Sequence, residues 1–349
     1  MKIAFLSFYS GIMYRGVETY VHELSNRLVK LGNEVTVYQG GDKLPGADYK
    51  TVTIKTKIDW TKKGTFFPLI NYYGLKVKEF THNVLKSIDP GTDIVFPTNG
   101  QWESILCSLW AKIHRKKIVI SGQSGPGLDD RMNILTFPNA FVSLTEYQKK
   151  WAKKANPLVR SCVIPNGVDL NKFSNPKPYN FELPKPVILN AAALVDWKRQ
   201  ELIIKAVSKL QSGSLVLVGK GDCESSLKEL GEKLLPGRFK ILSFAHKDMP
   251  QVYAGADLFT FPTVPWESFG IVMVEAMGNN LPVVAADDPI RREIVGDAGL
   301  FVDPTDTEAY TRALGKALSM NWGDKPRIQA EKFSWDTIAD KYQKLFKTL

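Results

Sequence analysis

The sequence predicts an α/β protein with two doubly wound, Rossmann-like domains and a ligand cleft between them. Its 349 residues are more than one core usually accommodates, so two domains are favoured. Each half begins with a short apolar strand, followed by a segment whose apolar residues recur at helical spacing, which indicates βαβ units. A stretch rich in Pro and turn residues, 165–186, separates the two halves and is interpreted as a linker.

The first half opens with a strand, a loop, a helix and a second strand. The first strand is expected over 2–8 and the loop over 9–16. The apolar periodicity of the helix runs from Val17 to Leu31, and the second strand covers 34–38. The loop follows the carboxyl end of the first strand, where open α/β sheets bind ligands. Later strands in this half are expected at 93–96, 117–120, 140–143 and 162–164.

The second half repeats this alternation of strands and helices. It is expected to begin with a strand over 187–191 and a helix over 199–210, and the chain should end in an amphipathic helix over 335–348. Further strands of this half are expected at 214–219, 239–242, 258–261, 282–285 and 300–302. The predicted domains are 1–168, completed by the helix at 334–349, and 169–333.

The chain has a formal net charge of +10, and its basic excess lies in the first half. Residues 1–170 contain 23 Lys and Arg against 14 Asp and Glu, whereas the remainder contains 23 against 22. Such an excess suits an anionic partner, and membrane lipid, nucleic acid and acidic glycan all qualify; the alternative is a solvated, soluble surface. No recognised nucleic-acid motif is present, so no nucleic-acid partner is predicted.

Cysteines and histidines show no functional spacing. Three Cys are scattered without a disulfide or metal pattern, which favours a reducing compartment. The four histidines, including His246, are interpreted as structural. No apolar run approaches the roughly 18 residues that span a bilayer, and the apolar start is too short for a signal segment. We expect a cytoplasmic protein whose basic first domain contacts the inner face of the membrane peripherally.

The stretch from 262 to 277 is the most informative segment of the chain. Glu267 lies on a Pro-rich loop, Gly270 ends that loop, and an apolar helix that carries Glu275 follows. Unpaired N–H groups and the dipole at a helix start attract phosphate. The segment therefore offers a diphosphate site with one acid before it and one after it, which suits a sugar nucleotide.

Taken together, the motifs resemble those of the retaining glycosyltransferase family 4, the group 1 glycosyltransferases, which have the GT-B fold. The resemblance covers nearly the whole chain. Its strongest segments are 163–169 with Phe173, 217–221, 253–257, 262–277 and 281–285. It implies transfer of a sugar from a nucleotide donor on the second domain to an acceptor on the first. It also implies retention of the anomeric configuration and no requirement for a metal or other cofactor.

By this resemblance, Glu267 faces the transferred sugar and Lys198 binds the donor diphosphate. A carboxylate can accept sugar hydroxyls and stabilise a developing cationic sugar, and a lysine stabilises charge on the departing nucleotide. The family usually has an Arg five residues before this lysine, where this chain has Ala193, so Arg199, or Arg15 from the other domain, is a candidate substitute. The structural alternatives are a helix-capping carboxylate and a solvated lysine.

Other donor contacts are carried over to the same domain. Glu275 is expected to accept the ribose hydroxyls; the alternative is an ordinary surface carboxylate. Gly219 and Gly221 follow a strand and are expected to shape a turn near the nucleotide. Backbone N–H groups expected to face the donor belong to Phe269, Gly270, Ile271 and Val272.

In the first domain, the resemblance points to two loops. Gly16 matches a family glycine, and Arg15 is a candidate contact for the donor phosphate or the acceptor; the alternative is a surface charge. The His that the family often places after the strand at 117–120 is replaced here by Gln123. Glutamine can hydrogen-bond a sugar hydroxyl but cannot titrate near neutral pH.

We therefore expect an enzyme that moves a hexose from a UDP- or GDP-sugar to a glycan or lipid-linked acceptor, in the synthesis of cell-surface polysaccharide or glycolipid. Because Ala193 and Gln123 depart from the family pattern, the alternative is a catalytically degenerate nucleotide-sugar-binding protein. Membrane docking is expected where Lys62 and Lys63 lie beside Phe66–Phe67, with Tyr72–Tyr73 following.

Overall fold

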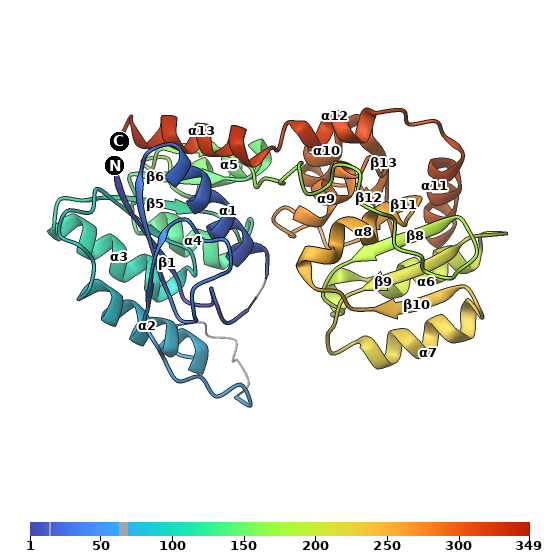
Figure 1. Ribbon diagram of the computed structural model, residues 1–349, viewed down its shortest axis with the longest axis horizontal. Coiled ribbons are helices and arrows are strands. Elements are labelled where there is room, and N and C mark those ends of the chain that lie inside the picture. Colours follow the sequence, from blue (N-terminus) through green and yellow to red (C-terminus); the bar gives the residue numbers. More distant parts are fainter. Residues whose placement is uncertain (14, 63–68) are drawn as a thin grey trace. The chain divides into compact units, whose positions relative to one another are not determined.

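A computed structural model describes residues 1–13, 15–62 and 69–349 of the chain (Figure 1). The chain forms two compact units. The first contains Met1–Asn166 together with Trp335–Leu349, and the second contains Gly167–Ser334. Each unit has its own parallel sheet with helices between the strands, so the prediction of two doubly wound domains is confirmed. The cleft expected between them stays a prediction.

In the described part of the first unit, seven strands form one sheet in the order β3-β2-β1-β4-β5-β6-β7. The strands are β1 (Lys2–Ser7), β2 (Glu34–Gln39), β3 (Lys50–Thr53), β4 (Ile94–Pro97), β5 (Lys117–Ser121), β6 (Ala140–Ser143) and β7 (Ser161–Val163). The strands predicted from apolar runs are confirmed within two residues, whereas β3 was missed. This edge strand has no buried residue, so it carries little apolar signal.

Helices cover both faces of this sheet and bury its apolar side chains. They are α1 (Gly16–Lys30), α2 (Tyr72–Leu85), α3 (Gln101–Ile113), α4 (Leu128–Leu135), α5 (Glu146–Ala155) and α13 (Trp335–Phe346). The last helix packs on α1, and Tyr20 donates a hydrogen bond to Tyr342 at 2.7 Å between two fully buried rings. The strand order reverses between β1 and β4, so the loops after these strands diverge and leave room for a ligand.

The second unit has a sheet of six strands in the order β10-β9-β8-β11-β12-β13. The strands are β8 (Val187–Ala191), β9 (Ser214–Val218), β10 (Phe239–Leu242), β11 (Leu258–Phe261), β12 (Val283–Ala286) and β13 (Gly299–Val302). The α-helices are α6 (Gln200–Ser208), α7 (Glu224–Leu234), α8 (Met249–Ala254), α9 (Ile271–Gly278), α10 (Pro289–Val295), α11 (Thr307–Ser319) and α12 (Lys325–Glu331). Short 3₁₀ turns are η1 (Asp196–Lys198), η2 (His246–Asp248) and η3 (Gly296–Ala298). The strand order reverses between β8 and β11.

None of the described helices combines the length and the apolar composition that a bilayer crossing requires.

Two buried carboxyl groups hold the loops at the carboxyl edge of the first sheet. Glu103 accepts hydrogen bonds from the backbone N–H groups of Thr98 and Asn99 at 2.7 and 2.9 Å. Asp130 accepts one from the Gly125 N–H at 2.9 Å. Burial raises the pKa of Glu103 and of Asp130 to about 7 in each case, despite these hydrogen bonds.

These raised pKa values predict that the first unit loses stability as the pH rises from about 4 to about 7. In that window the folded protein holds protons that the unfolded chain has released, so deprotonation favours unfolding. Glu103→Gln and Asp130→Asn should each reduce the pH dependence by roughly 1–3 kcal/mol. Urea unfolding at pH 5 and pH 7.5 measures this difference in the free energy of unfolding, and Glu79→Gln, at an exposed residue, is the control. An unchanged pH dependence in the double variant would contradict this account.

Candidate active site

Two loops of the second unit meet where its strand order reverses. The loop after β8 contains η1, and the loop after β11 contains Glu267. The carbonyl oxygen of Trp197 accepts hydrogen bonds from the Val264 N–H and the Thr263 hydroxyl, both at 3.3 Å. Because β8 and β11 are neighbours in the sheet, segments almost 70 residues apart in the chain become one surface.

Lys198 and Glu267 form an ion pair across these loops. The Lys198 Nζ lies 2.5 Å from the Glu267 Oε2, and the same oxygen lies 3.4 Å from the Thr263 hydroxyl. The lysine also lies over the Phe261 ring, 5.3 Å from its centroid. Their side chains are 15% and 19% exposed, so both are largely desolvated but still open to a ligand. The structure thus brings together the two residues predicted to be catalytic.

Arg291 fixes the loop that carries Glu267, and sequence reasoning missed it. Its side chain is fully buried and donates hydrogen bonds to the carbonyl oxygens of Glu267, Val264 and Pro265 at 2.7, 3.1 and 3.0 Å. Its Nε donates to the Asp288 carboxylate at 2.7 Å. The available signal was its position in α10, where it shares the buried face with Ile294 and Val295.

Glu275 lies in the middle of α9 and is 7% exposed. Its Oε2 accepts a hydrogen bond from the Tyr253 hydroxyl at 2.8 Å, and its Oε1 lies 3.5 Å from the Nε2 of His246. Burial, together with the neighbouring carboxylate, raises the pKa of Tyr253 well above its ordinary value. The structure therefore places His246, which the sequence indicated only as structural, beside a predicted ligand-binding carboxylate.

The start of α9 depends on a left-handed glycine. Gly270 has φ 84° and ψ 65°, and an added Cβ would approach the Phe261 and Met273 side chains to 2.9 Å. The Phe269 side chain is buried, as expected for a core residue. Ile271 and Val272 are half-buried, and their N–H groups belong to the first turn of the helix, where no intrahelical partner exists.

Gly219 and Gly221 allow two backbone segments to touch. A Cβ at Gly219 would lie 2.0 Å from the Ala192 carbonyl oxygen, and one at Gly221 would lie 2.3 Å from that of Leu194. The Leu194 N–H donates to the Lys220 carbonyl at 3.0 Å. These glycines therefore shape the loop that leads to η1.

Arg199 has a left-handed backbone at φ 57°, and α6 consequently begins at Gln200 instead of the predicted 199. Hydrogen bonds from Thr305 and, more weakly, the charge of Arg199 lower the pKa of Asp303. The guanidinium is thus close enough to the loop after β13 to influence a carboxylate there.

Arg15, Gly16 and Gln123 lie at the carboxyl edge of the first sheet. Arg15 precedes α1, whose first residue is Gly16, and its N–H and guanidinium donate to the Glu18 carboxylate at 3.0 and 3.2 Å. The Gln123 side chain exchanges two hydrogen bonds with the Asn166 amide, at 3.1 and 3.0 Å. Gln123 is therefore already paired within the first unit.

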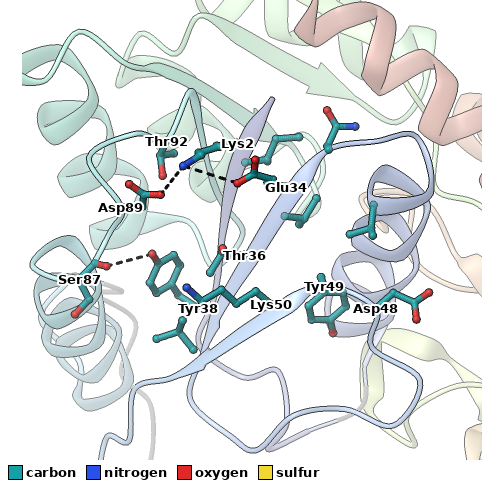
Figure 2. A pocket seen from close by; sticks show the side chains of 15 residues that line it. Lys2, Glu34, Thr36, Tyr38, Asp48, Tyr49, Lys50, Ser87, Asp89 and Thr92 are labelled. Atoms are coloured by element: carbon teal, nitrogen blue, oxygen red, sulfur yellow. Dashed lines mark hydrogen bonds and ion pairs between the residues drawn. The ribbon is translucent and has the colours of Figure 1, made fainter.

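A polar pocket of about 410 Å³ lies at the opposite, amino edge of the first sheet (Figure 2). Lys2 begins β1 and pairs with Asp89 at 3.1 Å and with Glu34 at 3.8 Å. The Tyr38 hydroxyl donates to the Ser87 carbonyl at 3.2 Å. Three of its charged side chains, Lys2, Glu34 and Asp89, thus pair with one another. Parallel sheets bind ligands at their carboxyl edges, so we do not place the active site here.

In the described part of the chain, no three His, Cys, Asp or Glu side chains converge as metal ligands.

Comparison with solved structures identifies a GT-B fold. The structure of Anabaena Alr3699/HepE in complex with UDP and glucose matches with a TM-score of 0.78 and 20% identity, covering 100% of both chains. WaaG, a glycosyltransferase involved in lipopolysaccharide biosynthesis, matches with a TM-score of 0.71 and 18% identity over 99% of both chains. At these identities the similarity shows the fold.

The chain belongs to the group 1, family 4 glycosyltransferases. The family model described as glycosyl transferases group 1 matches residues 171–334, and the model described as glycosyltransferase family 4 matches residues 14–172. The predicted family is thereby confirmed.

Curated relatives match over part of their length. The O-antigen chain mannosyltransferase B of Escherichia coli is 33% identical over 108 residues, covering 30% of this chain and 28% of the relative. A GDP-mannose-dependent phosphatidylinositol monomannoside mannosyltransferase of Corynebacterium glutamicum is 26% identical over 212 residues, covering 53% and 55%. The chain thus spans about half or less of the length of these relatives.

Proposed function

We propose that this protein is a retaining glycosyltransferase that moves a hexose from a UDP- or GDP-sugar to a glycan or lipid-linked acceptor, in the synthesis of cell-surface polysaccharide or glycolipid. The observation that carries the proposal is the Lys198–Glu267 pair at the carboxyl edge of the second sheet, directly before the α9 start. The names of the relatives support it, since they include mannosyltransferases that act on an O-antigen chain and on a phosphatidylinositol mannoside.

The proposed donor binds along α9. Its diphosphate takes the N–H groups at the helix start and the Lys198 ammonium, while the buried Glu275 accepts ribose hydroxyls. Lys198 then stabilises the charge that forms when the bond between the anomeric carbon and the phosphate oxygen breaks. The acceptor oxygen bonds to that carbon, and its proton passes to the departing phosphate oxygen. Glu267 stabilises the positive charge that develops on the sugar.

This mechanism requires no metal or other cofactor. Lys198 and the α9 start supply the positive electrostatic environment that a diphosphate leaving group requires. In the ligand-free protein, Glu267 holds Lys198 in place, and an arriving diphosphate competes with that carboxylate for the ammonium group.

A panel of UDP-, GDP- and ADP-sugars, without added metal, tests the donor assignment by thermal stabilisation of the purified protein. One donor class is expected to raise the melting temperature. Glu275→Ala should largely abolish the shift because the ribose loses its acceptor, while the exposed Glu308→Ala serves as control. No shift with any donor, or a full shift in Glu275→Ala, would contradict the assignment.

The second candidate function is a degenerate nucleotide-sugar-binding protein. It is favoured by Ala193 at the position of the missing family arginine and by the pairing of Gln123 with Asn166. Hydrolysis of the donor without acceptor separates the two. Slow release of free hexose from the stabilising donor supports an enzyme, whereas binding without any hydrolysis or transfer supports the degenerate protein.

We also propose a cytoplasmic location, with peripheral contact between the first unit and anionic membrane. Of the predicted docking segment, residues 63–68 lie outside the described part of the chain. The described surface offers a second candidate, the α3–α4 patch, where Leu109, Ile113, Leu135 and Phe137 are 57%, 68%, 51% and 49% exposed. Lys112 lies over the Phe137 ring, at 5.7 Å from its centroid. Exposed apolar side chains beside a lysine suit an anionic bilayer surface.

Sedimentation with vesicles tests this contact. Binding is expected to require anionic lipid, to weaken as salt rises, and to fall several-fold in an Ile113→Ser, Phe137→Ser variant. Leu75→Ser separates this patch from the segment first predicted, because Leu75 is 49% exposed on α2 next to that segment. Binding that ignores lipid charge and salt would refute the membrane contact, and loss only in Leu75→Ser would move it to α2.

A further inference from the structure

Each residue of the Lys198–Glu267 pair directly follows an exposed tryptophan in the chain. Trp197 directly precedes Lys198 in η1 and is 53% exposed, and Trp266 directly precedes Glu267 and is 62% exposed. Neither indole N–H has a hydrogen-bond partner within the described residues. Tryptophan is usually well buried, so two open indoles beside a candidate active site indicate a surface that a ligand covers.

The backbone presents these indoles from fixed positions. The Trp197 carbonyl accepts hydrogen bonds from Val264 and Thr263, which ties η1 to the second loop. On the other side of that loop, the buried Arg291 holds the carbonyl oxygens on both sides of Trp266, those of Pro265 and Glu267. Two loops joined in this way do not swing freely, so the exposure of the indoles is a property of the folded site.

The two indole rings and the Lys198–Glu267 ion pair together are chemically complementary to a sugar ring. The C–H face of a pyranose packs against an aromatic ring, while its hydroxyls can bond to a carboxylate, an ammonium group or an indole N–H. The ribose and base are expected at the Glu275 end of α9, whereas both tryptophans lie at the Glu267 end. The platform therefore belongs to the sugar side of the site.

We infer that Trp197 and Trp266 form a stacking platform for a pyranose ring, either the transferred hexose of the donor or the sugar of the acceptor. This inference rests on the proposed function and deepens it, because it assigns sugar recognition to two residues to which the proposed donor position gives no diphosphate or ribose contact. The same platform would narrow the choice of sugar, since only rings with a continuous C–H face can lie flat on an indole.

Binding and kinetics of Trp197→Ala and Trp266→Ala test the platform, with Phe and Leu variants at each position. UDP-glucose and GDP-mannose are the donor probes, UDP and GDP are the sugar-free probes, and methyl glucoside and methyl mannoside are the acceptor probes. Each Ala variant is expected to lose roughly five- to tenfold in affinity for one sugar-bearing probe. Phe should restore most of the loss because it retains a ring, and Leu should not. Trp60→Ala is the matched control, since Trp60 is 47% exposed in the first unit.

Each outcome decides the inference. Weaker nucleotide-sugar binding with unchanged UDP and GDP binding assigns the platform to the transferred hexose, and a raised acceptor KM with unchanged donor affinity assigns it to the acceptor. Three results would overturn the inference. The first is a double Ala variant whose affinities and kinetic constants stay within twofold of wild type. The others are equal rescue by Leu and Phe, and a loss of UDP and GDP binding equal to the loss of nucleotide-sugar binding. A wild-type protein that binds none of the nucleotides would instead refute the proposed function itself.

Discussion

Glu267→Ala and Lys198→Ala are each expected to lower the turnover number by about 100-fold or more, the scale of a lost transition-state contact. Lys198 would no longer stabilise the departing diphosphate, and Glu267 would no longer stabilise the positive charge on the sugar. Neither change should unfold the protein, because both side chains reach the surface of the site. Steady-state rates with the donor found in the panel measure the effect, and circular dichroism verifies the fold.

The two changes should not be additive. The Lys198 ammonium and the Glu267 carboxylate are in contact at 2.5 Å, so each single variant also leaves the other charge without its partner. The double Ala variant is therefore expected to be only slightly slower than the slower single variant. Lys209→Ala is the control because Lys209 pairs with Glu308 on the exposed surface of the same unit, and it should retain wild-type turnover. Wild-type turnover in both single variants would refute the site assignment.

Much of the fold could be predicted because buried parallel strands are short apolar runs. The strands at β6, β8, β10 and β11 have the predicted bounds, since turn residues or polar segments flank each run. The close approach of Lys198 to Glu267 was also accessible, because the family resemblance assigned both residues to one ligand. Apolar runs in the sequence and the order of the family motifs were sufficient to predict these strands and this residue pair.

Other features depend on tertiary contacts that no local pattern encodes. Helical periodicity could place Arg291 on the buried face of α10, but only the packing of α10 against the Glu267 loop shows that its guanidinium holds that loop. The pairing of Gln123 with Asn166 and of Tyr253 with Glu275 joins residues 43 and 22 positions apart. Hydrogen bonds of this kind depend on how the loops pack.

Arg291→Met is expected to destabilise the second unit by about 3–5 kcal/mol, the cost of removing one partner from a buried ion pair. The change leaves the Asp288 carboxylate without its guanidinium partner and three loop carbonyl oxygens without a donor. Arg291→Lys should recover only part of this loss, because one ammonium group cannot reproduce the planar fork that reaches both ends of the loop. Urea unfolding, analysed as two transitions because the units have separate cores, measures the change.

Arg292→Met provides a matched control one residue away. Arg292 pairs with Asp287 on the surface, with its side chain 57% exposed, and should change stability by at most about 1 kcal/mol. If Arg291 acts only on stability, the Arg291→Lys variant should have a normal turnover number at temperatures below its melting point, where it is still folded. If it positions Glu267, the folded variant should lose turnover while its affinity for free UDP or GDP stays near wild type, because Glu275 and the α9 start are untouched. A small stability change in Arg291→Met, equal to that in Arg292→Met, would show that the loop does not depend on the buried guanidinium.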